Sequence, residues 1–112
     1  TLTLPAKASD PKAGNANPKP LDFKITAARV GEVAIVGLGG EVFNGIGRTI
    51  KKSSPFAHTI IITHCNGAAG YLVCPEAYAE GGYEVRTTRF SPEAAGMVIK
   101  ETQSLLARLK EE

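Results

Sequence analysis

Two short, strongly apolar runs constrain most what this chain can fold into. Residues 33–38 read Val-Ala-Ile-Val-Gly-Leu, and residues 59–63 read Thr-Ile-Ile-Ile-Thr. Such runs predict strands that are buried on both faces. Between them, residues 42, 43, 46 and 50 are apolar at helical spacing. A strand, a crossover helix and a second strand predict a right-handed βαβ unit with parallel strands.

Patterns on either side of this unit extend the predicted fold. Phe23, Ile25 and Ala27 alternate with polar residues, which indicates a half-buried strand. Residues 91–93 read Ser-Pro-Glu, a cap, a proline and an acid that together favour a helix start. An apolar stripe then continues to residue 109. We expect an α/β fold with a small mixed sheet of about three strands and a long C-terminal helix, as part of a larger α/β domain.

Residues 1–21 differ in composition from the rest of the chain. They hold four of the seven prolines and show almost no hydrophobic periodicity. Because proline lacks an amide donor and favours extended backbone, we predict an extended proline-rich arm or linker here. Residues 22–112 are assigned to the α/β portion.

Charge and composition argue against a nucleic-acid partner and against a membrane-spanning segment. The net charge is +2, and no basic stripe with interleaved aromatic residues is present, so we expect no nucleic-acid partner. No apolar run approaches the roughly 18 residues that a membrane span requires, so we expect no transmembrane segment. Cys65 and Cys74 are expected to be reduced, although a bridge across the short loop between them stays open.

A glycine-rich corner follows each apolar run. Residues 37–41 read Gly-Leu-Gly-Gly-Glu, and residues 64–67 read His-Cys-Asn-Gly. Parallel strands place their carboxyl ends side by side, and ligands of open α/β sheets bind there. We therefore expect Glu41 to lie close to His64, Cys65 and Asn66.

Two interpretations of Glu41 remain open from spacing alone. An acid at a predicted helix start is stabilised by the helix dipole, or the carboxylate serves as a metal ligand or general base. A dinucleotide fingerprint is disfavoured, because Val42 stands where its third glycine is required. His64 and Cys65 have no partner at an established ligand spacing, so neither is assigned to a metal.

Three tyrosines, Tyr71, Tyr78 and Tyr83, follow in a short stretch after the second corner. Each either packs its ring in the core with the hydroxyl hydrogen-bonded, or lines a ligand site. A loop this rich in glycine favours a role in close backbone approach.

The order and spacing of several short motifs in this chain are similar to those of a known family. These motifs are residues 33–37 leading to Gly40 and Glu41, Asn66 followed five positions later by Tyr71, Glu-Ala-Tyr at 76–78 and Gly-Tyr-Glu at 82–84. The segment from about residue 25 to residue 109 resembles the C-terminal part of the catalytic domain of neutral/alkaline non-lysosomal ceramidases and their shorter bacterial relatives.

The resemblance implies a zinc-dependent amidase that cleaves the N-acyl bond of ceramide. In that family two histidines from an N-terminal segment, one glutamate and one tyrosine hold the zinc. The resemblance assigns Glu41 and Tyr71 as zinc ligands, and Asn66, Tyr78 and Tyr83 as candidates for the substrate wall. It assigns no catalytic residue within this chain.

The chain also departs from the family pattern. Gly39 stands where the family has proline, and nothing matches the histidine-rich motif or the catalytic serine segment. The resemblance therefore implies a fragment or subunit that is inactive alone, with the missing N-terminal portion of the same enzyme as its partner. It further implies a lipid or other acyl-amide substrate and a secreted or periplasmic location. The alternative is a non-catalytic α/β interaction module.

Overall fold

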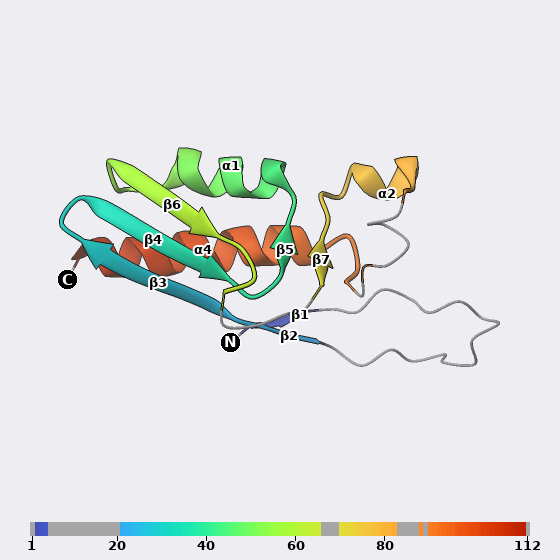
Figure 1. Cartoon of the computed structure of the whole chain (residues 1–112), viewed down its shortest axis with the longest axis horizontal. Helices are drawn as coiled ribbons and strands as arrows, with labels where there is room; N and C mark the ends of the chain where they lie inside the picture. The colour runs from blue at the N-terminus through green and yellow to red at the C-terminus, as the bar shows by residue number, and fades with distance from the viewer. Residues whose placement is uncertain (1, 5–20, 66–69, 83–87, 89, 112) are drawn as a thin grey trace.

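A three-stranded mixed sheet lies at the centre of the molecule. The computed structural model describes residues 2–4, 21–65, 70–82, 88 and 90–111. The sheet has the order β3-β4-β6, with β3 at Ile25–Val30, β4 at Val33–Leu38 and β6 at His58–Ile62 (Figure 1). β3 is antiparallel to β4, and β4 is parallel to β6. Helix α1, at Asn44–Ser53, connects the two parallel strands. The predicted mixed sheet and strand–helix–strand unit are confirmed.

A two-residue strand separates β4 from α1. Residues Glu41–Val42 form β5, which pairs in parallel with β7 at Tyr71–Leu72. The N–H groups of Glu41 and Phe43 donate to the carbonyl oxygens of Gly70 and Leu72, at 2.8 and 3.0 Å. The expectation that Glu41 lies at a helix start is therefore wrong, because these backbone bonds hold residues 41–43 extended and α1 begins only at residue 44.

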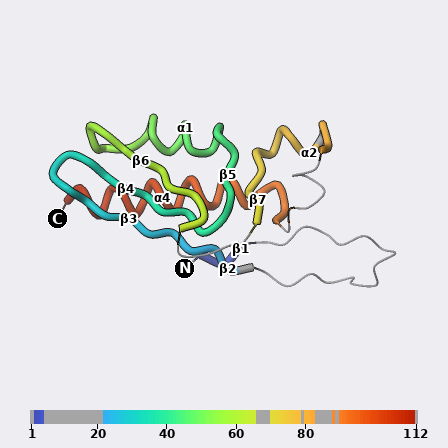
Figure 2. The backbone as a smooth tube through the Cα atoms, viewed as in Figure 1, coloured from blue at the N-terminus to red at the C-terminus, as the bar shows by residue number. Residues whose placement is uncertain are grey.

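The long C-terminal helix α4 spans Ala94–Glu111. Its predicted start is confirmed, since the Ala94 N–H donates to the Ser91 carbonyl at 3.1 Å. A short helix, α2, lies at Ala77–Glu80. The α4 helix runs behind the sheet and ends beside the β3–β4 turn (Figure 2). There Arg29 donates to the Lys110 carbonyl at 3.1 Å.

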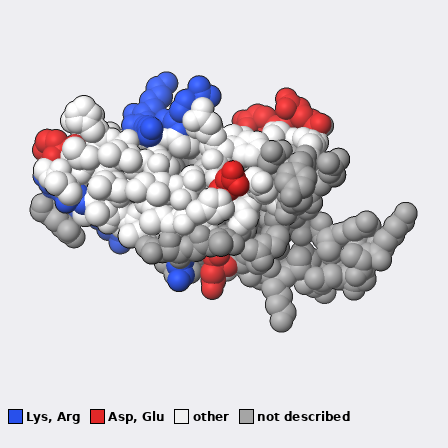
Figure 3. All heavy atoms as spheres, viewed as in Figure 1, with Lys and Arg blue, Asp and Glu red and all other residues white. Residues whose placement is uncertain are grey.

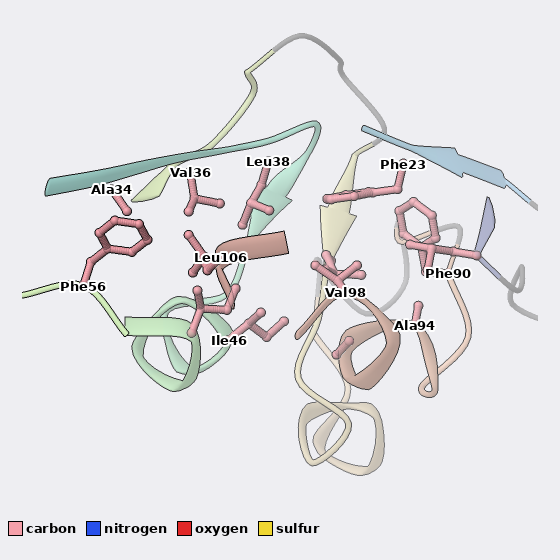
Figure 4. Close-up of a cluster of buried hydrophobic side chains, with 14 residues drawn as sticks. Phe23, Ala34, Val36, Leu38, Ile46, Phe56, Phe90, Ala94, Val98 and Leu106 are labelled. Atoms are coloured by element: carbon pink, nitrogen blue, oxygen red, sulfur yellow. The ribbon is translucent and has the colours of Figure 1, made fainter. Parts of the chain in front are cut away.

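The hydrophobic core lies between one face of the sheet and the two longer helices. Side chains from α1 and α4 meet those of β4 in a single layer (Figure 4). The core residues of β4 are Ala34, Val36 and Leu38, and those of the helices include Ile46, Ile50, Val98 and Leu106. Both helices thus cover the same face, and in the described part of the chain no element covers the other. The expectation that both apolar runs are buried on both faces is therefore wrong within the described residues, where Ile60 and Ile62 of β6 are exposed.

The described ends of the predicted proline-rich arm pair with each other. β1, at Leu2–Leu4, is antiparallel to β2, at Leu21–Phe23. Phe23 is fully buried, and its ring packs edge-on against Phe90 at a centroid distance of 5.9 Å. The rest of the arm lies outside the described residues, so its boundary stays a prediction. No helix within the described ranges is long and apolar enough to cross a membrane.

Candidate functional site

Backbone hydrogen bonds join the two glycine-rich corners. The His64 N–H donates to the Gly40 carbonyl, and the Cys65 N–H donates to the Leu38 carbonyl, each at 3.0 Å. The predicted juxtaposition of Glu41 with His64 and Cys65 follows from these bonds. Asn66 lies outside the described residues.

The glycines of the first corner allow the backbones to approach closely. A Cβ atom on Gly37 would lie 2.5 Å from the Cys65 sulfur, and one on Gly40 would lie 2.7 Å from the Gly70 carbonyl oxygen. These distances are shorter than ordinary contacts of a Cβ atom, so a side chain at either position would force its neighbours to shift. The corner is therefore a packing junction between neighbouring chain segments.

Glu41 and Tyr71 are direct partners in the β5–β7 pair. Paired residues of neighbouring strands project from the same face of a sheet, so the carboxylate and the phenol leave the backbone side by side. The Glu41 side chain is 52% exposed. Tyr71 is half-buried. The resemblance selected these two residues, and the register brings them together; their role as metal ligands stays a prediction.

His64 lies against the Glu41 carboxylate. Its Nε2 atom is 3.5 Å from Oε2 of Glu41, and its side chain is half exposed. His64 has a φ of 53°, the one positive φ of a non-glycine residue in the described segments. The strand topology predicted His64 as a neighbour of Glu41, but the ligand spacing of the sequence assigned it no role at a metal site.

Thr88 is a positioning residue that the sequence analysis missed. Its buried hydroxyl donates to the Tyr71 carbonyl at 2.6 Å and accepts from the Phe90 N–H at 3.2 Å. These bonds hold β7, and with it the backbone of Tyr71, to the segment that leads into α4. A single threonine between elements carries no periodic signal, so the sequence pattern could not reveal it.

Tyr78 has a structural role in the described part of the chain. Its hydroxyl donates to the Phe90 carbonyl at 2.7 Å, which ties α2 to the segment before α4. Burial raises the pKa of this phenol; a hydrogen bond with Thr88 opposes the shift and the charge of Glu93 adds to it. Its placement in a substrate wall stays a prediction, and Tyr83 lies outside the described residues.

The two cysteines are both unbridged, in accord with the expected reduced state. The Cys65 side chain packs against Gly37. Burial raises the pKa of the Cys74 thiol, and the negative charge of Glu76 adds to the shift. Because the thiolate is the reactive form of cysteine, these surroundings disfavour Cys74 as a nucleophile.

Glu41 and Tyr71 fit a zinc site only as part of a ligand set. Among the described residues, no group of three or more His, Cys, Asp or Glu side chains could hold a metal ion. A catalytic zinc takes three protein ligands or more and accepts oxygen donors among them. The accessible carboxylate beside a phenol fits as two such donors, and a zinc site here would require further ligands.

Two solved structures are similar to this chain over most of its length. Neutral ceramidase from Pseudomonas aeruginosa superposes with a TM-score of 0.72 at 23% identity, over 84% of this chain and 16% of that one. A ceramidase complexed with C2 superposes with a TM-score of 0.70 at 22% identity, over 78% and 15%. No family model and no curated protein matches the sequence. The chain thus has the fold of a small part of bacterial neutral ceramidase.

Proposed function

We propose that this chain is part of a zinc-dependent amidohydrolase that resembles ceramidase, and that Glu41 and Tyr71 are two of its zinc ligands. The observation that carries the proposal is their direct pairing on β5 and β7. The similarity to two ceramidase structures supports the proposal. The match covers only a small segment of each, which supports the idea that this chain is one part of a larger enzyme.

Within this site each residue has a physical task. Glu41 offers an accessible carboxylate oxygen, and His64 limits the positions that this carboxylate can take. Thr88 fixes the backbone that carries the Tyr71 phenol. When bound, zinc supplies a water of lowered pKa and polarises the carbonyl of an amide. We infer that the missing ligands and the catalytic group belong to polypeptide outside these residues, so that the chain alone is inactive.

The proposed substrate class is an N-acyl amide of a lipid or a related acyl amide. The structural relatives are ceramidases, and a secreted or periplasmic location is part of the same proposal. Both rest on resemblance, and hydrolysis of a panel of acyl amides of different chain length by the complete protein would test the substrate class.

Metal analysis of the complete protein tests the ligand assignment. Glu41→Gln removes the negative charge of one proposed ligand, and Tyr71→Phe removes the hydroxyl of the other. Zinc content and amide hydrolysis should therefore both fall strongly. Glu80→Gln is the matched control, because Glu80 is an exposed acid on α2, and it should leave both unchanged. Undiminished zinc in the Glu41→Gln and Tyr71→Phe variants would contradict the proposal.

A non-catalytic α/β interaction module is the second candidate. The exposed apolar residues Val30, Ile60 and Ile62 favour a docking function, which such a module also requires. Zinc content separates the two, since a module of this kind needs no metal at Glu41 and Tyr71.

A further inference from the structure

One face of the central sheet is apolar and exposed. Val30 is 67% exposed, Ile60 49% and Ile62 45%, although side chains of this type are normally buried. Val33 and Ile35 lie on the same face of β4, between these residues, and are half-buried. We call the open face the set of residues on these three strands whose side chains point away from α1 and α4: Thr26, Ala28, Val30, Val33, Ile35, His58, Ile60 and Ile62.

The strand register makes this a continuous surface. Ile35 is paired with Ile60, and Val33 with Val30. The open face includes no Lys, Arg, Asp or Glu. Figure 3 shows the same contrast: a broad uncharged surface extends over β3, β4 and β6, while basic side chains gather over α1. Contiguous apolar surface of this kind marks an interaction site.

The composition of β4 indicates what covers the open face. This central strand is apolar on both of its sides, the pattern of strands buried on both faces. The covered face is packed by helices, and α/β domains complete such a sheet with helices on its second face. A layer of helices with apolar stripes therefore fits the open face better than a charged or polar partner.

We propose that the open face docks against apolar helix faces in the remaining polypeptide of the hydrolase. This inference rests on the proposed function. The structural match spans only 16% of the ceramidase chain, so most of that protein's polypeptide lies outside the matched region. An acidic area over β5, the strand of Glu41, stands on the same side of the molecule as the open face (Figure 3). A layer docked here would bring further donors close to Glu41.

Cysteine labelling measures whether the open face is covered. Ile60→Cys places a thiol on the open face, and Lys52→Cys, on the exposed side of α1, is the matched control. Both are made with Cys65→Ala and Cys74→Ala, and maleimide labelling is measured in the isolated chain and in the complete protein. We expect Ile60→Cys to react at least about tenfold more slowly in the complete protein, and Lys52→Cys to react equally in both. If the cysteine-free background does not fold, hydroxyl-radical footprinting of Ile60 and Ile62 in the unmodified protein gives the same readout.

Zinc content, measured in the same samples, separates this inference from the proposed function. Protection of Ile60 without bound zinc supports the docking surface and contradicts the ligand assignment. Full labelling of the Ile60→Cys variant in a zinc-containing complete protein overturns the docking surface alone. Full labelling without bound zinc overturns both the docking surface and the ligand assignment. Protection already present in the isolated chain, together with a dimeric mass, overturns the proposal in favour of a second copy.

Discussion

The helix-covered side of the sheet and the β5–β7 corner are built by different forces. On the covered side, Val36, Leu38, Ile50 and Leu106 are fully buried and define each other's positions by packing. At the corner the side chain of Glu41 is about half exposed, and backbone hydrogen bonds between residues 40–43, 64 and 70–72 hold the geometry. Packing therefore sets the stability of the fold, while backbone pairing sets the arrangement of the candidate site.

This difference indicates that the stability of the fold and the chemistry of the candidate site can be changed independently. A buried methylene contributes about 0.8 kcal/mol to stability, whereas an exposed ion pair contributes roughly 0–1 kcal/mol. Substitutions on the covered side should therefore act on folding, and substitutions of the corner side chains on ligand binding. Three predictions, in order of decreasing effect on stability, test this distinction.

The largest effect is expected from Leu106→Ala in the core. Leu106 is fully buried between α4 and the sheet, and the substitution leaves a cavity. It should lower the free energy of unfolding by about 2–5 kcal/mol, measured by urea denaturation. Met97→Ala, at a 38% exposed position on the same helix, is the control and should cost much less. Equal losses for the two variants would break the distinction between the covered side and the surface.

Gly40→Ala tests whether close backbone approach holds the corner. Its Cβ would lie 2.7 Å from the Gly70 oxygen and 3.0 Å from the Phe23 ring, and the Gly70 oxygen already accepts the Glu41 N–H. We expect a loss of about 1–3 kcal/mol in the free energy of unfolding. Gly47→Ala, with no atom within 4 Å of the new Cβ, should instead stabilise α1 by about 0.5–1 kcal/mol. Thermal unfolding of both variants measures the difference, and a neutral Gly40→Ala would contradict the account of the corner.

The smallest effect is a pH dependence at the far end of the sheet. The Lys110 ammonium donates to the Glu32 carboxylate at 2.6 Å. In the folded chain this hydrogen bond lowers the pKa of the Glu32 carboxyl below its ordinary value of 4.5. Because the folded-state pKa is depressed, the pair stabilises the fold above the unfolded pKa, and this contribution is lost as pH falls through the folded pKa. Glu32→Gln should therefore be slightly less stable than the original chain at pH 7 and equally stable at strongly acidic pH.

Urea denaturation across this pH range measures the Glu32 contribution. Lys110→Gln removes the same pair from the other side and should reduce the pH dependence to a similar extent. A pH dependence that persists in both variants would assign the acid sensitivity to other carboxyl groups.

The sequence predicted the elements whose signals are periodic or chemically marked. Helix α4 begins directly after the Ser-Pro-Glu motif, and β4 and β6 lie on the two apolar runs. The corner was only partly predictable. Strand order placed Glu41 near His64, but the β5–β7 pair depends on contacts between residues thirty positions apart, which no local pattern encodes. For the same reason Thr88, whose role comes from hydrogen bonds to distant parts of the chain, could not be found in the sequence.

Anomalous diffraction at the zinc absorption edge, on crystals of the complete protein, tests the central claim most directly. The account predicts a zinc peak about 2.0–2.2 Å from a Glu41 carboxylate oxygen, with the Tyr71 hydroxyl as a second ligand. A zinc peak bound by other residues, or none at the β5–β7 corner of a protein that hydrolyses acyl amides, would contradict it.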